Sequence, residues 1–284
     1  MIRFWKRTAA KEAGECGLRV ATAMLSDTGC HREINEDYVL VVSPLDTAIC
    51  SKKGILALVA DGMGGHEAGE VASRLAAETV KRSYYETSGS AGVALAAAFQ
   101  EANRKVLKLA RRRKNYSGMG TTCTALVLMG ELAFAAHVGD SRLYLVRRHG
   151  IYQMTEDHTA VMDMVRRGIL NTEEAQKHED RSVLLRALGT HDQLDVSVWT
   201  EPLKVMREDR FVLCTDGLHD LVHDDEILRI VESSEPQSAC AALVTLARER
   251  GGYDNVTVAI VSLKSAPNED EIELRETRDA EVCK

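Results

Sequence analysis

Apolar residues recur along the chain at two different spacings, which separates the expected strands from the expected helices. Short apolar runs at 18–23, 38–42 and 55–60 are typical of strands, and we expect the second run to pair with the first. In 70–81 and 91–112, apolar residues occupy every third or fourth position and charged residues fill the positions between. This spacing predicts two long amphipathic helices.

A second group of strand-like runs follows these helices. The runs are short, apolar and separated by turn residues, and they span 123–129, 132–138, 143–147 and 151–154. We expect them to form hairpins, with His149-Gly150 as one of the turns.

The last third of the chain contains one segment unlike the others. Residues 156–190 are polar and helix-prone with few apolar anchors, whereas 211–214 and 256–263 are typical of strands. Two short helices are expected at about 224–233 and 236–250. Many strands and a few long helices in separate runs predict an α+β fold with antiparallel sheets. Two sheets packed face to face, with helices outside, would bury the apolar side of every element.

Composition favours one substantial domain. The 284 residues are 45% hydrophobic and 28% charged, and four prolines with no long polar linker predict a single domain at 18–263. Residues 1–17 are expected to be a weakly ordered extension, either a plain tail or a docking segment through Ile2, Phe4 and Trp5. The acid-rich segment 264–284 is expected to be disordered.

Charge and cysteine content limit the possible binding partners and the cellular compartment of the protein. A net charge of -7 disfavours a nucleic-acid partner, and the one basic run, 111–114, is interpreted as a solvated helix end. No apolar run approaches the ~20 residues that span a bilayer. The first residues lack the apolar stretch of a signal peptide, and the seven cysteines contain no C-x-x-C pair. We therefore expect a cytoplasmic protein with no membrane span.

Candidate chemistry lies in four short acidic segments that end strand-like runs or lie in tight turns. They are Asn35-Glu36-Asp37, Asp61-Gly62-Met63-Gly64-Gly65-His66, Thr215-Asp216-Gly217 and Asp254-Asn255. A carboxylate at the end of a buried strand is costly unless it is paired or holds a cation. Mg²⁺ and Mn²⁺ prefer oxygen ligands. The sequence therefore predicts a metal site assembled from distant strand ends.

Together with further segments, these motifs resemble those of the PP2C-type (PPM) metal-dependent protein serine/threonine phosphatases, particularly the bacterial branch. The matching pieces are 26–37, 59–66, 118–122, 139–142, 186–189, 215–218 and 254–257. They occur in the order and spacing of the family and cover about residues 18–263, which makes the set far more specific than any one piece.

The resemblance implies a four-layer α-β-β-α sandwich with a flap subdomain at about 156–190 and two divalent ions, Mn²⁺ or Mg²⁺, in a cleft. By this resemblance Asp61 bridges both metals, the Gly62 carbonyl binds one of them, and Asp216 and Asp254 hold the other. A water shared by the two ions would attack phosphorus without a covalent enzyme intermediate.

Three further positions carry roles by the same resemblance. Glu36 and Asp37 match residues that orient metal-bound waters, and Arg32 matches the phosphate-binding arginine. Arginine suits this role because its planar fork can grip two phosphoryl oxygens. The implied activity is removal of phosphate from phosphoserine or phosphothreonine in proteins, opposing a bacterial Ser/Thr kinase.

The chain departs from the family pattern at two positions. Met63 stands where animal and plant members have a histidine that is proposed as the general acid. The general acid is therefore unassigned: a metal-bound water or His66 could serve, and His66 is alternatively a metal ligand or a turn histidine. Asn115 stands where the family often places an aspartate that helps to bind a third metal, so a third ion would bind weakly.

Other residues receive a structural interpretation or a candidate role in selectivity. Asp27 and Asp140 are interpreted as structural carboxylates, and Thr121-Thr122 as strand-entry packing. In the expected flap, the residues that we associate with substrate selection are Met162, Val165 and Arg166.

Two other functions remain open at this point. A catalytically silent phosphatase fold could bind phosphoproteins, but such a protein is expected to lose metal carboxylates, and Asp61, Asp216 and Asp254 are all present. A phosphodiesterase or small-molecule phosphatase would differ only in its substrate.

Overall fold

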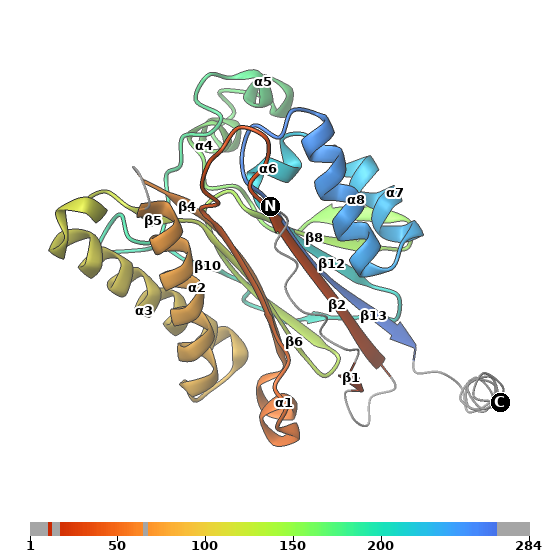
Figure 1. Cartoon of the computed structure of the whole chain (residues 1–284). Coiled ribbons are helices and arrows are strands. Elements are labelled where there is room, and N and C mark those ends of the chain that lie inside the picture. The colour runs from red at the N-terminus through yellow and green to blue at the C-terminus, as the bar shows by residue number, and fades with distance from the viewer. Residues whose placement is uncertain (1–10, 13–17, 65–67, 266–284) are drawn as a thin grey trace.

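The protein has four layers, in the order helices, sheet, sheet, helices (Figure 1). The computed structural model describes residues 11–12, 18–64 and 68–265. Both sheets are antiparallel, which confirms the predicted α+β class and the α-β-β-α sandwich. None of the helices in this described part of the chain combines the length and hydrophobicity needed to cross a bilayer.

The first sheet combines the ends of the chain with its middle. In spatial order its strands are β1 (Lys11–Glu12), β2 (Leu18–Asp27), β13 (Val256–Ser265), β12 (Arg210–Cys214), β8 (Arg142–Arg147) and β9 (Gly150–Gln153). Helices α7 (Asp224–Ser233) and α8 (Pro236–Glu249) cover its outer face. Their apolar stripes, which include Val231 and Leu243, are completely buried with Val212 and Ile260 of the sheet.

The second sheet is built mainly from the chain between 37 and 138. In spatial order its strands are β10 (Ser197–Val198), β7 (Leu132–Val138), β6 (Cys123–Met129), β4 (Ile55–Met63) and β3 (Asp37–Val42). Two further short strands complete it, since β11 (Leu203–Lys204) pairs with β7 and β5 (Gly120–Thr121) pairs with β4.

Helices α2 (Ala68–Glu86) and α3 (Ala91–Arg112) cover the outer face of the second sheet. Both bury alanines, which let helix backbones approach closely, and Phe99 and Tyr84 fill the remaining space. The Tyr84 hydroxyl donates to the Lys53 carbonyl at 2.6 Å, so this buried phenol is satisfied. Between the two sheets, a third apolar cluster includes Val59 and Phe211.

Three expectations about strand pairing were wrong in detail. The strand at 38–42, now β3, pairs with β4 and lies in the other sheet from β2. Strands β7 and β8 are consecutive along the chain but belong to different sheets. The turn of the β8–β9 hairpin is Arg148-His149, because Arg147 faces Gly150; both turn residues have positive φ, at 52° and 60°.

Two α-helices of the described chain were not expected. Helix α1 (Thr47–Lys53) has no buried residue and so gives no apolar stripe to detect, although the Asp46 side chain caps it by accepting from the amide of Ala48 at 2.8 Å. Helix α6 (Asp216–His219) is a single turn that follows β12.

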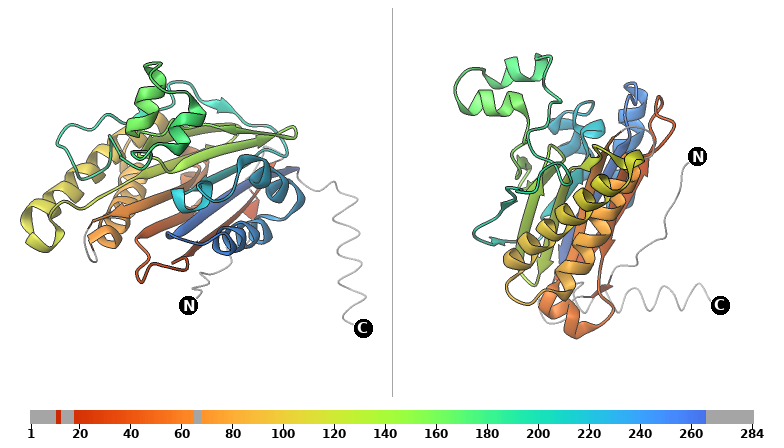
Figure 2. Two further views of the ribbon diagram at one scale, coloured as in Figure 1. Left: turned by 90° about the horizontal axis from the view of Figure 1, so that it is seen from above. Right: turned by 90° about the vertical axis from the view of Figure 1, so that its left-hand side faces the viewer.

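The flap stands at one end of the sandwich. Its helices α4 (Ala160–Arg166) and α5 (Thr172–Lys177) project from the body (Figure 2). Its two legs pair with each other, since Thr159 bridges to Leu184 and the Leu185 amide donates to the His158 carbonyl at 2.8 Å. Apart from β1 and residues 264–265, the predicted N-terminal extension and acidic tail lie outside the described residues, together with His66.

Candidate active site

The ends of several strands surround one cleft of about 370 Å³. Six predicted site residues line it together: Arg32, Glu36, Asp61, Gly62, Asp216 and Asp254. They come from both sheets, because Asp61 lies near the end of β4 in one sheet whereas Asp216 follows β12 in the other. The structure therefore assembles the predicted cluster from segments far apart in sequence.

Two threonines fix the backbone of Asp61. The Thr122 hydroxyl accepts from the Asp61 amide at 2.9 Å, and the Thr121 hydroxyl donates to the Asp61 carbonyl at 2.8 Å. Thr122 also bonds to the Ser141 hydroxyl at 2.7 Å. These threonines were expected only to pack at the start of a strand, but they also set the position of the central aspartate.

Asp37 lies buried beside Asp61, because the two residues face each other in the β3–β4 register. The Thr215 hydroxyl donates to Asp37 Oδ2 at 2.8 Å and accepts from the Thr257 amide at 3.1 Å. This chain of bonds connects the two sheets directly under the cleft.

A glycine follows each of two cleft aspartates because backbone from another segment approaches it. A Cβ at Gly62 would lie 2.1 Å from the Gly69 carbonyl oxygen, and a Cβ at Gly217 would lie 2.0 Å from the Asn255 carbonyl oxygen. Neither glycine has a positive φ. Close approach of backbone, rather than tight turning, therefore explains both Asp-Gly pairs.

Asn255 holds the rim of the cleft together. Its carboxamide donates to the carbonyls of Thr28 and Ile34, both at 3.0 Å, and accepts from the Glu36 amide at 2.8 Å. Sequence reasoning included Asn255 in a motif but assigned it no role. Next to it, Asp254 forms a 2.8 Å ion pair with Arg32, whose side chain is 49% exposed.

The electrostatics of the cleft favour a bound cation. Burial, together with the neighbouring carboxylates, raises the pKa of Asp61 well above its usual range and that of Asp37 to about 7. Burial also raises the pKa of Asp216. Two buried oxygens in the described structure, Glu36 Oε1 and Asp216 Oδ1, have no hydrogen-bond partner. Closely spaced oxygen donors with unsatisfied lone pairs fit hard divalent ions.

The cleft carboxylates do not form a ready-made cage. Within the described residues, no three His, Cys, Asp or Glu side chains converge on one point. Asp254 is instead paired with Arg32. The residues fit the implied metals by type, burial and unsatisfied oxygens.

Asp140 is a cleft residue that sequence reasoning assigned to structure. It lines the cleft with 8% exposure, and burial and the charge of Asp216 raise its pKa to about 7. His219 Nε2 donates to the Asp140 carbonyl at 3.1 Å, and its Nδ1 lies 3.3 Å from Asp220 Oδ1. Like Asp61, Asp140 follows a buried strand, so the same signal was present in the sequence.

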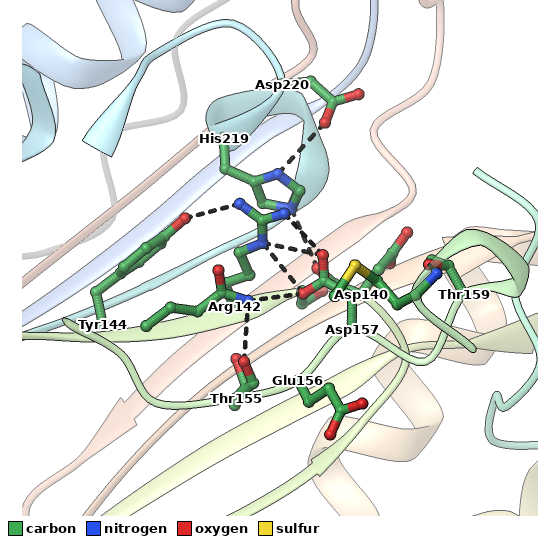
Figure 3. Close-up of polar contacts among 12 residues, drawn as sticks. Asp140, Arg142, Tyr144, Thr155, Glu156, Asp157, Thr159, His219 and Asp220 are labelled. Atoms are coloured by element: carbon green, nitrogen blue, oxygen red, sulfur yellow. Dashed lines mark hydrogen bonds and ion pairs between the residues drawn. The ribbon is translucent and has the colours of Figure 1, made fainter. Parts of the chain in front are cut away.

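Buried polar contacts connect the start of the flap to this part of the cleft (Figure 3). Arg142 bonds to both carboxylate oxygens of Asp157, at distances down to 2.7 Å, and to the Tyr144 hydroxyl at 3.0 Å. Next in the chain, the His158 amide donates to the Gly139 carbonyl at 2.7 Å, and His158 Nδ1 accepts from the Gly139 amide at 3.1 Å.

The residues with candidate roles in selectivity and third-metal binding are not among those that line the cleft. Asn115 is exposed on the short helix η1 (Lys114–Tyr116). Of the flap candidates on α4, Met162 and Val165 do not line the cleft, and Arg166 pairs with Asp163. The flap residues that do line it, Ser182 and Leu184, come from its second leg. The candidate roles remain predictions.

Comparison with known proteins identifies the family. The sequence model of protein phosphatase 2C matches residues 31–256. The chain therefore belongs to the protein phosphatase 2C family and is a serine/threonine protein phosphatase.

Bacterial relatives share most of the chain. It is 36% identical over 242 residues to the serine/threonine phosphatase Stp of Listeria monocytogenes. This alignment covers 83% of this chain and 93% of the relative. It is 39% identical over 246 residues to the phosphatase PstP of Mycobacterium tuberculosis, covering 85% of this chain and 44% of that longer protein.

Solved structures agree with the fold. A crystal structure of PstP from Mycobacterium tuberculosis superposes with a TM-score of 0.77 at 35% identity, covering 86% of this chain and 99% of that one. A structure of the PstP catalytic domain in complex with two manganese ions gives a TM-score of 0.75 at 34% identity. The match covers 87% of this chain and 100% of that chain.

Proposed function

We propose that this phosphatase hydrolyses phosphoserine and phosphothreonine in proteins with two divalent cations, Mn²⁺ or Mg²⁺, held in the cleft. The observation that carries the proposal is the cluster of buried carboxylates beside an exposed arginine, with Asp216 Oδ1 left without a partner. A related phosphatase structure that holds two manganese ions supports it.

In this proposal Asp61, the Gly62 carbonyl, Asp216 and Asp254 hold the cations. Divalent cations held there would supply a water of lowered pKa as the nucleophile near neutral pH. Glu36 and Asp37 orient water molecules at the site.

Arg32 is proposed to bind the phosphoryl group. It lines the cleft and is half exposed, so its guanidinium can face an incoming substrate. Its pairing with Asp254 sets it at the edge of the carboxylate cluster. The guanidinium fork suits two phosphoryl oxygens at once.

Hydrolysis of p-nitrophenyl phosphate tests the proposal directly. We expect turnover with Mn²⁺, none with EDTA, and a loss of at least about a hundredfold in kcat for Asp216→Asn, because the metal loses a charged ligand. Phosphoprotein binding without turnover above the Asp216→Asn background would instead establish the silent binding module.

We further propose that a third ion binds weakly near Asn115. Measuring turnover against Mn²⁺ concentration for the Asn115→Asp variant tests this. If the metal dependence of turnover is unchanged, the proposal of a third ion is wrong. The exposure of Asn115 on η1 means that the segment would have to approach the cleft.

The wider assignments are also proposals. We propose a cognate bacterial Ser/Thr kinase as the opposing enzyme, the cytoplasm as the location, and 18–263 as the catalytic domain. The family match over 31–256 supports the domain. The five cysteines that the structure describes are all free, which agrees with a reducing compartment. Loss of the phosphatase in a deletion strain should raise phosphorylation on the substrates of that kinase.

A further inference from the structure

A group of positive side chains at the C-terminal end of α3 lies on the surface and is not among the residues that line the cleft. Lys108, Arg112, Arg113 and Lys114 are all exposed, and within the described residues none of them has a carboxylate at ion-pair distance. We call these four residues the α3 basic cluster. One or two cations suffice to complement the negative end of a helix dipole, so four exceed that need.

The α3 basic cluster is held in a defined place. Beside it, Arg111 forms two bonds to Asp192, at 2.8 and 2.6 Å, which connect the end of α3 to the segment that follows the flap. The Arg113 guanidinium lies 5.8 Å from the centre of the Tyr116 ring, a cation–π contact. The cluster therefore adjoins the segment that follows the flap.

A short connection leads from the cluster to the cleft. After η1 the chain enters β5, where Gly120 pairs with Met63, a residue that lines the cleft. Gly120 is seven positions after Arg113 in the chain, so these two residues lie at most about 25 Å apart. Figure 1 places the end of α3 and β5 at the same end of the molecule as the flap. An extended substrate segment of about seven residues spans that distance.

We propose that the α3 basic cluster binds an acidic segment of the phosphoprotein substrate, four to eight residues from the phosphorylated residue. This inference rests on the proposed function, because it requires a phosphorylated residue in the cleft. Charge complementarity supports the partner: the chain as a whole carries a net charge of -7, so this local positive surface is unusual on it. A substrate already held by its phosphate meets the cluster at high effective concentration, which makes weak exposed contacts useful.

Anionic membranes fit the cluster less well. Four cations on a protein with net charge -7 leave most of the surface repelled by an acidic bilayer, and stable membrane attachment takes a second anchoring signal. The cluster contributes selectivity among phosphoproteins rather than attachment to a surface.

The test compares two charge-neutralising double variants. Arg112→Gln/Lys114→Gln removes half of the cluster, and Arg82→Gln/Lys52→Gln removes two exposed cations from α2 and α1 at the opposite end of the second sheet (Figure 1). The substrates are p-nitrophenyl phosphate and two series of phosphothreonine peptides. One series carries three glutamates four to eight residues from the phosphothreonine, on either side, and the other carries glutamines there.

We expect the wild-type protein to prefer one glutamate peptide over its glutamine counterpart by about threefold to tenfold in kcat/KM at 50 mM NaCl, through a lower KM. The preference should disappear in the Arg112→Gln/Lys114→Gln variant, remain in the control variant, and fade at 500 mM NaCl. All three proteins should hydrolyse p-nitrophenyl phosphate equally.

Several outcomes would overturn the inference. The cluster has no such role if the wild-type protein shows no glutamate preference, or if the Arg112→Gln/Lys114→Gln variant keeps that preference. It also has no such role if kcat/KM of the variant falls equally for the glutamate and the glutamine peptides. Cluster-dependent binding to phosphatidylglycerol vesicles without peptide preference would assign it to lipid. An absence of p-nitrophenyl phosphate hydrolysis in wild type would instead count against the proposed function itself.

Discussion

Individual side chains in the cleft are positioned mostly by hydrogen bonds to backbone. Asn255 bonds to three separate backbone groups on the rim, and two threonines hold the amide and carbonyl of Asp61. The glycines after Asp61 and Asp216 each allow a second backbone to pass within contact distance. Small residues at this site therefore matter as much as the charged ones.

Substituting Gly217 with alanine should be strongly destabilising. The added Cβ would meet the Asn255 carbonyl oxygen at 2.0 Å, and this backbone atom cannot move without disturbing the rim. We expect Gly217→Ala to lower the free energy of unfolding by about 3 kcal/mol or more. The control is Gly92→Ala in α3, where the nearest atoms lie at 3.9 Å and a gain of about 0.5 kcal/mol is expected. Urea denaturation checks both, and equal stabilities would contradict the steric account.

Sequence reasoning found most of the charged residues of the site and missed the residues that support them. Asp61 and Asp216 were found because a carboxylate after a buried strand is costly without a partner. The same rule applied to Asp140 would have placed it in the cleft, but its turn setting offered an ordinary explanation. The bonds of Asn255 join segments more than two hundred residues apart, so no local pattern could reveal them.

At the level of elements, one histidine helps to hold the base of the flap, together with the Arg142–Asp157 ion pair. Burial, the positive charges of its neighbours and the contact with His137 lower the pKa of His158 to about 3, so the ring is neutral. Nδ1 accepts from the Gly139 amide, which leaves the Nε2 proton to donate to the Ser197 hydroxyl at 3.0 Å. One side chain thus joins the flap to β10 and to the residue before Asp140.

Removing this side chain should loosen the flap. We expect His158→Ala to increase hydrogen exchange in 156–190 about fivefold, since one buried hydrogen bond contributes about 1 kcal/mol. The carboxamide oxygen of His158→Asn can still accept from Gly139, so that variant should change exchange less than twofold. Equal exchange in the two variants would show that the Gly139 bond does not hold the flap.

The elements themselves were predicted with uneven success for physical reasons. The long helices α2 and α3 were found because each buries a continuous apolar stripe. Helix α1 buries nothing and left no such signal. The partner of β3 was misassigned because alternation shows that a strand has a buried face but does not show which strand lies beside it.

For the whole molecule, stability should depend on pH through the buried acids. The pKa values of Asp37 and Asp140 are about 7, above the ~3.9 of an unfolded aspartate. Between those values the folded chain holds more protons than the unfolded chain, so the free energy of unfolding falls as pH rises. His137 and His158 have lowered pKa values, about 4 and about 3, and act in the opposite direction only below pH ~6.5.

Raising the pH from 6.5 to 8 in EDTA should therefore lower the free energy of unfolding by about 1 kcal/mol for each of the two carboxylates. Saturating Mn²⁺ should remove or reverse this dependence, because metals bind the deprotonated form. Urea denaturation at the two pH values, with EDTA and with Mn²⁺, provides the measurement. Constant or increasing stability in EDTA would show that these acids are not protonated in the folded state.

The position of β13 has a consequence for how the protein is made. This strand is the last one in the described chain, yet it lies between β2 and β12 in the interior of its sheet, and Asp254 stands just before it. A nascent chain on the ribosome cannot join β2 to β12 until residues 256–265 emerge from the exit tunnel. The phosphatase thus gains its complete first sheet and its full set of cleft carboxylates together, only after this strand has emerged.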